Sequence, residues 1–346
     1  MNDQISSLEN RVKAYLHSNI PEAQNLTLAN FTQMTEGFSY ETYLVDAQWR
    51  IGEKIVSQGF AIRRVPEAGA VEPYNIEAQY RILKVVENTP VPAPKPYWLE
   101  MDEGILGRPF FVMEKVEGEV PIPWGFENHE VFKDPERRLK MAKNLIQVLA
   151  DYQAIDWRQT CTDFLPVPQR PTDPAEFELE RWAQNIQKFK TYPQPLLKEV
   201  YFWLRKNKPH TPVFTLTHSD FRLGNFIWRD DRIVAFLDWE MPGIGDPMAD
   251  LAWMCLKILR SPNSNLMCML IEREDLYRYY EELTGTKVDE GRVFYWEVMG
   301  YFKLAAVFIS AIRAFSDGKN RDVRLITLQD SVHYACLKEL TELLEF

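Results

Sequence analysis

Cysteine is scarce in this chain of 346 residues: there are four, and no two of them form a C-x-x-C pair. This scarcity weakens the case for a structural zinc site or a disulfide framework and fits a reducing compartment. The opening stretch, MNDQISSLEN, lacks the basic and apolar regions of a signal peptide. The longest apolar run, 304–312, is too short to span a bilayer. We therefore expect a cytoplasmic protein whose partner is not a membrane.

Positive charge is also in deficit. The 40 Lys and Arg residues are outnumbered by 50 Asp and Glu residues, so the formal net charge is −10. Nucleic acids and anionic membrane surfaces bind to basic footprints, so neither is expected as the main partner. The sequence also lacks a G-x-x-x-x-G-K-[ST] loop and the H-R-D, D-F-G and A-P-E motifs of protein kinases. These absences disfavour a P-loop enzyme and a protein kinase.

A change of pattern near residue 115 divides the sequence into two parts. Between about 28 and 65, runs rich in Thr, Phe, Tyr and Val alternate with Gly-containing turns, which is typical of antiparallel strands. Beyond about 120 the apolar spacing becomes helical, apart from one β-rich island at 213–239. The length also exceeds what one hydrophobic core usually serves. The sequence thus predicts an α+β protein with a β-rich first lobe, 1–115, and a mainly helical second lobe, 116–346.

Helices are predicted wherever apolar residues recur every three or four positions. The predicted ranges are 5–17, 75–88, 134–155, 175–190, 195–206, 246–260, 271–284, 290–315 and 324–344. The Pro-punctuated stretch 89–98 is predicted to be extended, and 109–119 to be an apolar strand that runs into a Gly turn.

The β island reads as a strand followed by a hairpin. The strand at 213–217 leads into a loop that contains His218 and Asp220. The next two strands are joined by the dipeptide Asp230-Asp231, which is typical of a two-residue turn. The loop therefore enters on the open side of a hairpin.

The hairpin brings two oxygen-bearing side chains to its open end. Centred on its turn, the register places Asn225 opposite about residue 236, and Asp238 lies two residues further on, roughly 6–7 Å along the strand. A carboxylate and a carboxamide that converge there can coordinate Mg²⁺, which prefers hard oxygen ligands and substrate phosphates. Asp220 precedes Asn225 on the same loop, where it can accept a proton from a hydroxyl that attacks a metal-bound phosphate. The residues alone thus predict a phosphoryl-transfer site.

Several stretches together resemble the aminoglycoside phosphotransferase and choline kinase-like family, whose members phosphorylate small molecules. The stretches that carry the resemblance are H-x-D-x-x-x-x-N (His218, Asp220, Asn225), Asp238 in LDWE, GDPMADLA (245–252), GFSYETY (37–43), AIRR (61–64), FFVMEKVEG (110–118) and DYQAIDW (151–157). The sequence is most similar to the branch related to acyl-CoA dehydrogenase-linked phosphotransferases. The resemblance implies a bilobal protein kinase-like fold, with a nucleotide-binding first lobe and a second lobe that holds the catalytic loop and the acceptor site.

The resemblance also implies roles for the polar residues of the island. Asp220 would be the catalytic base, and His218 would brace the catalytic loop. Asn225 and Asp238 would bind the metal. Ser219 stands where the family usually has Gly in H-G-D.

Further implied roles lie in the first lobe. Arg63 would replace the Lys that contacts the nucleotide, as is common in this branch, and Glu77 would pair with Arg63. A two-residue shift would put Gln79 there instead. Ser39 lies in the stretch that resembles the phosphate-covering hairpin, and the backbone of Glu114 to Val116 would hold the adenine.

The resulting expectation is an enzyme that uses ATP and Mg²⁺ to phosphorylate a hydroxyl of a small molecule. The acceptor is left open between a hydroxyacyl-CoA, an aminoglycoside-like compound and another hydroxylated metabolite. One alternative is a nucleotide-binding pseudokinase, and another is a metal-dependent phosphohydrolase that uses Asp220, Asp238 and Asp246. Asp246 precedes a proline and a helix, so it is expected to be a helix cap, and Asp250 is expected to anchor the catalytic loop.

Overall fold

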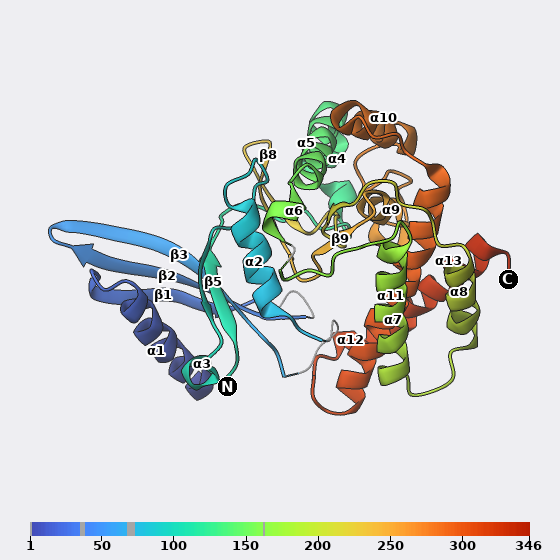
Figure 1. Cartoon of the computed structure of the whole chain (residues 1–346). Helices are drawn as coiled ribbons and strands as arrows, with labels where there is room; N and C mark the ends of the chain where they lie inside the picture. The colour runs from blue at the N-terminus through green and yellow to red at the C-terminus, as the bar shows by residue number, and fades with distance from the viewer. Residues whose placement is uncertain (1, 35–38, 68–72, 162) are drawn as a thin grey trace.

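The computed structural model describes residues 2–34, 39–67, 73–161 and 163–346 (Figure 1). Its first part is a five-stranded antiparallel sheet in the order β1-β2-β3-β5-β4, together with three helices. The elements are α1 (Asn2–Asn19), β1 (Gln24–Gln33), β2 (Glu41–Ile51), β3 (Lys54–Arg64), α2 (Ile76–Val86), β4 (Pro96–Glu100), α3 (Glu103–Leu106) and β5 (Phe110–Glu114). The strands and the two longer helices agree with the pattern expected for the first part of the chain.

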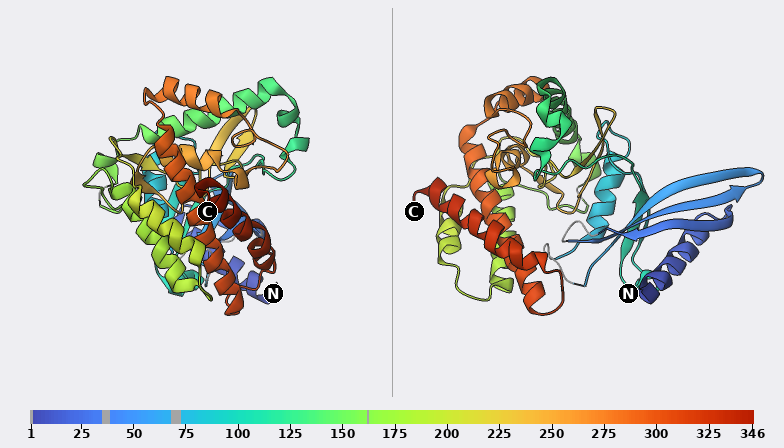
Figure 2. Two further views of the ribbon diagram at one scale, coloured as in Figure 1. Left: turned by 90° about the vertical axis from the view of Figure 1, so that its right-hand side faces the viewer. Right: turned by 180° about the vertical axis from the view of Figure 1, so that it is seen from behind.

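The two faces of this sheet pack against different partners. Phe60 and Ile62 of β3 belong to a cluster that also contains Leu16 of α1. Ala61, between them, belongs to a second cluster that includes α2 and the helical part of the chain. Because side chains alternate along a strand, Arg63 points to the same side as Ala61. Figures 1 and 2 show α1 and α2 on opposite sides of the sheet, with α2 nearer the helical part.

The second part of the chain is mainly helical. Its helices are η1 (Phe126–Asn128), α4 (Glu130–Lys133), α5 (Pro135–Gln153), α6 (Trp157–Thr160), α7 (Asp173–Phe189), α8 (Pro195–Lys206), α9 (Met248–Cys255), η2 (Lys257–Leu259), α10 (Arg273–Thr284), α11 (Glu290–Ser316), α12 (Arg324–Leu328), the π-helical η3 (Gln329–His333) and α13 (Tyr334–Leu344). All seven helices predicted in this part are present in essence. The predicted 246–260 ends early, at Cys255, and the predicted 324–344 is divided by the π-helical segment.

Helix α11 is the central helix of this part. It has 27 residues and is apolar and long enough to cross a membrane, but 72% of its most apolar window is buried inside the protein. It packs against α7, α9 and α13. The helix therefore forms the core of the helical part, and a charged side chain on its buried face lies in a costly environment.

Four short strands support the site. They are β6 (Thr215–Thr217), β7 (Phe226–Arg229), β8 (Arg232–Phe236) and β9 (Gly243–Gly245). Strand β9, which pairs with β6, was not predicted, because GIG has none of the usual β-forming pattern beyond one isoleucine. A Cβ on Gly243 would lie only 2.9 Å from Oγ1 of Thr217, so the close pairing requires glycine there.

The β7–β8 hairpin has the predicted turn but a different register. Asp230 and Asp231 have φ angles of 52° and 58°, as a two-residue type I′ turn requires. Ile227 pairs with Ala235, whereas Trp228 pairs with Ile233, so the return strand carries one extra residue. This β-bulge places Asn225 opposite residue 237 rather than 236, and the predicted register is wrong by one position. The N–H of Leu237 accordingly donates to the carbonyl of Asn225 (2.7 Å).

Candidate active site

The loop 218–225 connects β6 to β7 and is held by α9. The carboxylate of Asp250 accepts the backbone N–H groups of His218 (2.8 Å) and Ser219 (2.7 Å), so the expected anchor is present. Ser219 has φ 68°, a left-handed conformation that is unusual for a residue other than glycine. Burial raises the pKa of Asp250 to about 6, against the lowering effect of the two N–H donors. The anchor thus holds a strained peptide immediately before Asp220.

His218 joins this loop to the exit of the hairpin. Its side chain is almost completely buried, and Nε2 lies 3.0 Å from the carbonyl of Leu237. Its Nδ1 accepts the backbone N–H of Asp220 at 3.3 Å. Burial lowers the pKa of His218 to about 4, so the ring is neutral at pH 7, and the two contacts require the proton on Nε2. Because both ring nitrogens contact the backbone, His218 holds the loop in place and is not placed to act as a base.

The neutral state of His218 has a measurable consequence for stability. The unfolded imidazole takes up a proton near pH 6.5, whereas the folded one does so only near pH 4. The unfolded state therefore binds more protons in this window, so His218 stabilises the fold fully above pH 6.5. That contribution, about 3 kcal/mol, is lost as the pH falls towards 4.

Urea unfolding of the wild type and of His218→Gln between pH 4 and 7 measures this effect. Asp250, whose pKa is raised from 3.8 to about 6, acts in the opposite direction, because the folded state holds its proton more tightly. It is present in both proteins, so its effect cancels in the difference. A difference in unfolding free energy that stays constant over this range would show that the folded imidazole is not kept neutral by burial.

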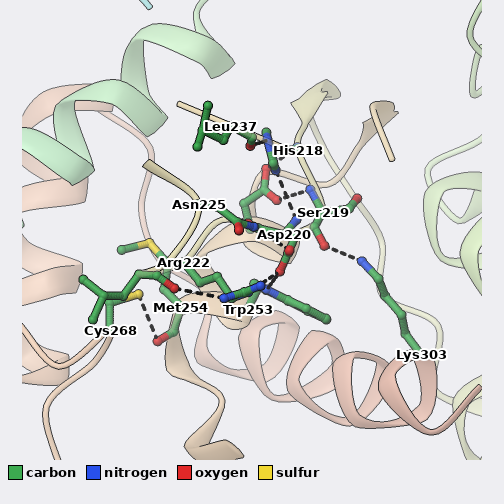
Figure 3. Close-up of polar contacts among 12 residues, drawn as sticks. His218, Ser219, Asp220, Arg222, Asn225, Leu237, Trp253, Met254, Cys268 and Lys303 are labelled. Atoms are coloured by element: carbon green, nitrogen blue, oxygen red, sulfur yellow. Dashed lines mark hydrogen bonds and ion pairs between the residues drawn. The ribbon is translucent and has the colours of Figure 1, made fainter. Parts of the chain in front are cut away.

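Asp220 is surrounded by donors. Its Oδ1 accepts Nε of Arg222 (2.9 Å) and the indole N–H of Trp253 (2.8 Å), and its Oδ2 accepts the side-chain amide of Asn225 (Figure 3). Burial raises the pKa of Asp220, but the Arg222 and Lys303 cations outweigh it, and the pKa lies below its usual value. The group is therefore an ionised carboxylate, suited to orienting a hydroxyl and accepting its proton late in a transfer.

Asn225 and Asp238 provide the oxygen donors expected for a metal. The amide nitrogen of Asn225 donates to the carbonyl of Asp220 (2.9 Å) as well as to its carboxylate, so the amide oxygen is left to act as an acceptor. Asp238 follows the hairpin with a side chain that is 25% exposed. This donor set fits Mg²⁺, which takes only one or two protein oxygens when phosphates and water complete its shell. Within 2–34, 39–67, 73–161 and 163–346 there is no cluster of three or more His, Cys, Asp or Glu side chains that could hold a metal by itself.

Arg63 reaches this region from β3. Its guanidinium forms an ion pair with Asp238 and lies 3.1 Å from a carboxylate oxygen of Glu240. It also stacks over the ring of Tyr40, 4.8 Å from the centroid. Glu240, which the sequence analysis missed, is 7% exposed, and burial and the neighbouring Asp238 raise its pKa to about 8. In the sequence, the position of Glu240 two residues after Asp238 in LDWE could have indicated that it lies at the site.

The predicted pair between Glu77 and Arg63 is wrong. Glu77 has a side chain that is 56% exposed and lies 3.7 Å from Arg81 on the same helix. Gln79, two residues further on, is almost fully buried. Residues two apart on an α-helix lie about 200° apart around its axis, so only one of them can face the interior. The cation on β3 instead pairs with Asp238 at the hairpin exit, and Glu240 lies beside it.

The other nucleotide-site predictions concern Ser39 and the segment that follows β5. Ser39 is described and hydrogen bonds to the Glu240 carboxylate, but positions 37 and 38 of the predicted phosphate-covering hairpin lie outside the described residues. Glu114 ends β5, and its N–H donates to the carbonyl of Lys95 (2.8 Å). The segment from Glu114 to Val116 leads from the sheet to the helical part. Contact of this backbone with adenine stays a prediction.

Asp246 has a structural environment. It is fully buried, forms a bidentate ion pair with Arg292 and accepts the hydroxyl of Thr211 (2.8 Å). It also accepts the N–H of Met248 (2.9 Å) at the start of α9, as expected of a residue that caps this helix. A phosphohydrolase that uses Asp246 beside Asp220 is therefore disfavoured.

A cavity of about 220 Å³ lies beside the 218–225 loop, among α7, α9, α11 and β9. Ser219 and Trp253 form the wall nearest to Asp220. Lys303, Arg181 and Glu178 also line the cavity, together with other aromatic and apolar side chains. An apolar cavity with a few convergent charged groups beside a reactive carboxylate has the character of a small-molecule site.

This chain is similar to one protein-family model and to several known proteins. The model of the phosphotransferase enzyme family matches residues 31–285. Mouse acyl-CoA dehydrogenase family member 10 is 29% identical over 231 residues, which is 65% of this chain and 20% of that protein. Human acyl-CoA dehydrogenase family member 11 is 23% identical over 314 residues, 82% of this chain and 38% of that protein. The chain thus spans well under half the length of these relatives.

Solved structures with the same fold are those of phosphotransferases. A Ralstonia eutropha protein assigned to the aminoglycoside phosphotransferases has a TM-score of 0.73 at 20% identity, over 97% of this chain and 98% of its own. A thermostable mutant of the aminoglycoside phosphotransferase APH(4)-Ia, solved with ADP and hygromycin B, has a TM-score of 0.56 at 15% identity, over 94% and 98%. The predicted bilobal, kinase-like fold is confirmed.

Proposed function

Because the chain belongs to the phosphotransferase enzyme family, whose members are kinases for hydroxyl groups of small molecules, we propose that it transfers the γ-phosphoryl group of ATP to such a hydroxyl with Mg²⁺. The observation that carries the proposal is the arrangement around Asp220. This carboxylate is kept ionised between two cations, on a loop that also presents Asn225, with Asp238 at the exit of the adjoining hairpin.

Each polar residue of the candidate site has its own role in the proposed phosphoryl transfer. Asn225 and Asp238 would hold Mg²⁺, which supplies neutralisation of charge on the phosphates when bound. Asp220 orients the acceptor hydroxyl and takes its proton as the phosphoryl group is transferred. Arg222, next to Asp220, adds positive charge where the transferred group carries negative charge. Arg63 would turn from Asp238 to the phosphates when the nucleotide binds.

The acceptor that we propose is a hydroxyacyl-CoA or a related hydroxylated acyl compound. The curated relatives are acyl-CoA dehydrogenase family members, whereas structural neighbours bind the aminoglycosides hygromycin B and gentamicin. The cavity beside the loop supports the first class through its aromatic and apolar wall, which includes Phe177 and Trp296, while its charged lining is balanced at two cations and two acids. A small cavity with aromatic and apolar walls and no excess of negative charge suits an apolar chain better than a polycationic sugar. A screen of hydroxyacyl thioesters, hydroxy acids and aminoglycosides for ADP release tests this choice.

The alternative is a nucleotide-binding pseudokinase. The observation that favours it is the ion pair between Arg63 and Asp238, since this arginine replaces the expected lysine and contacts the carboxylate expected to bind the metal. A pseudokinase would bind Mg-ATP and release no ADP above the background in the screen. ADP release in the acceptor screen therefore distinguishes the kinase from the pseudokinase.

Mg-ATP is expected to raise the melting temperature of the protein, and EDTA is expected to remove most of the increase. A ligand at about 100 times its dissociation constant adds roughly 2.7 kcal/mol to the unfolding free energy. The metal dependence is expected because Asn225 and Asp238 supply only two protein oxygens, which need phosphates to complete the site. Differential scanning fluorimetry with Mg-ATP, ATP alone and MgCl₂ alone separates the contributions. An unchanged melting curve at millimolar Mg-ATP would remove the basis of the proposed function.

Asp238→Ala is expected to weaken Mg-nucleotide binding more than Asn225→Ala does. The carboxylate carries a full charge, whereas the carboxamide offers only a dipole to the metal. Calorimetric titration of both variants with Mg-ATP gives the ranking, and titration with ATP in EDTA is the control for metal-independent contacts. The opposite ranking would mean that Asp238 serves chiefly as the partner of Arg63.

A further inference from the structure

Lys303 is a buried cation to which the transfer described above gives no direct contact with the reacting groups. It lies on α11, with 4% of its surface exposed, and its ammonium group donates to the backbone carbonyl of Ser219 (Figure 3). The charged groups around it are Glu178 and Arg181 of α7, Asp220 and Asp250. Burying an ammonium group is costly unless its partners compensate. A lysine at the centre of the core helix therefore needs an explanation in the contacts that it makes.

Those contacts lead to Asp220 by two routes. The first is the peptide between Ser219 and Asp220, because the ammonium group binds the carbonyl of that peptide. The second is Trp253, whose ring lies 4.2 Å from Nζ of Lys303 and whose indole N–H donates to Oδ1 of Asp220 (2.8 Å). A cation held over an indole ring stabilises one orientation of that ring. The orientation of the Trp253 N–H, and with it the position of the carboxylate, is thus coupled to Lys303.

The backbone of Ser219 is also held at its N–H end. Asp250 accepts the N–H groups of His218 and Ser219, while Lys303 binds the carbonyl of Ser219, so an anion and a cation hold successive backbone groups. Ser219 has a left-handed backbone that a serine adopts only when its surroundings impose it. Asp250 binds only N–H groups, so without Lys303 the backbone carbonyl of Ser219 would lose its partner. Lys303 binds this carbonyl, which is the backbone group of Ser219 that adjoins Asp220.

We propose that Lys303 is a positioning residue for the phosphoryl transfer. Its ammonium group fixes the Ser219 carbonyl and the Trp253 ring, and so aims the Asp220 carboxylate at the acceptor hydroxyl. This inference rests on the proposed function for its catalytic consequence, whereas its structural part concerns the loop alone. It differs from a purely stabilising role, which would lower the melting temperature without lowering kcat in the protein that remains folded.

The test compares Lys303→Met, Lys303→Arg and Trp253→Phe with Lys338→Met, which removes an exposed lysine from α13. Three quantities are measured: the melting temperature, amide hydrogen exchange of the 218–225 loop by mass spectrometry, and kcat and KM with Mg-ATP and the best acceptor of the ADP-release screen. In Lys303→Met we expect a lower melting temperature, because the Ser219 carbonyl and the buried carboxylates lose their cationic partner. We also expect loop exchange about tenfold faster, and kcat lower by roughly 10- to 100-fold with KM for Mg-ATP within about threefold. Lys303→Arg should recover most of both losses, and Lys338→Met should resemble the wild type.

Trp253→Phe separates the two routes and keeps the proposal testable if Lys303→Met does not fold. It retains a ring beneath the ammonium group but removes the hydrogen bond to Asp220, so kcat should fall while loop exchange stays near that of the wild type. Wild-type exchange and kcat in Lys303→Met, or wild-type kcat in Trp253→Phe, would overturn the proposal. If the wild type phosphorylates no acceptor, the proposed function fails, and hydrogen exchange alone then decides whether Lys303 orders the loop.

Discussion

Asp220→Asn is expected to lower turnover on the acceptor hydroxyl by roughly 10²–10⁴, the usual contribution of a positioned proton acceptor. Mg-ATP binding is expected to stay within a few-fold of the wild type. The reason is the division of contacts at the site: Asp220 is held by Arg222, Trp253 and Asn225, whereas Asp238, after the hairpin, is the charged donor that we propose for the metal. The substitution keeps the size of the side chain and removes its negative charge.

The measurements are ADP release with the best acceptor and calorimetric titration with Mg-ATP. Asp230→Asn is a matched control, because it makes the same change at the exposed turn of the β7–β8 hairpin, where the side chain is 92% exposed. Equal ADP release by the wild type and Asp220→Asn would favour the pseudokinase. Complete loss of nucleotide binding would instead identify Asp220 as a metal ligand, as in the phosphohydrolase alternative.

Arg292→Met is expected to lower the free energy of unfolding by about 3–5 kcal/mol, which is the usual cost of leaving one partner of a buried ion pair without the other. Asp246 is fully buried and receives a bidentate contact from this arginine. The hydroxyl of Thr211 and the N–H of Met248 also reach Asp246, but neither carries a charge. The remaining carboxylate would therefore be desolvated and uncompensated.

Urea unfolding of Arg292→Met and of the double variant Arg292→Met/Asp246→Asn checks this expectation. The double variant should recover part of the loss, because it removes the buried charge as well as its partner. Arg313→Met, at the other end of α11, removes an arginine that is 42% exposed and pairs with Asp317, so it should cost less than about 1 kcal/mol. A loss below 1 kcal/mol in Arg292→Met would mean that water or a neighbouring group compensates Asp246.

The elements around the site could be predicted from the sequence where they depend on local spacing. The loop with His218 and Asp220, the turn at Asp230-Asp231 and the capping contact of Asp246 follow from residue types within a few positions of one another. Strand alternation and turn chemistry act over such distances, so they leave a readable pattern. The bulge between β7 and β8 was not predicted, because one extra residue changes the register of the two strands without changing the types of residue in them.

Only the tertiary structure determines which charged side chains contact one another and which backbone groups they bind. Arg63 contacts Asp238 across 175 positions of sequence, in place of the predicted Glu77 only 14 positions away, because the packing of α2 turns Glu77 to solvent. Lys303 reaches the Ser219 carbonyl across 84 positions. In the sequence it is one lysine within a long apolar helix, with no sign of a partner. Charge pairs of this kind depend on the relative position of packed elements, which no local pattern of residues encodes, since burial and distance set their strength.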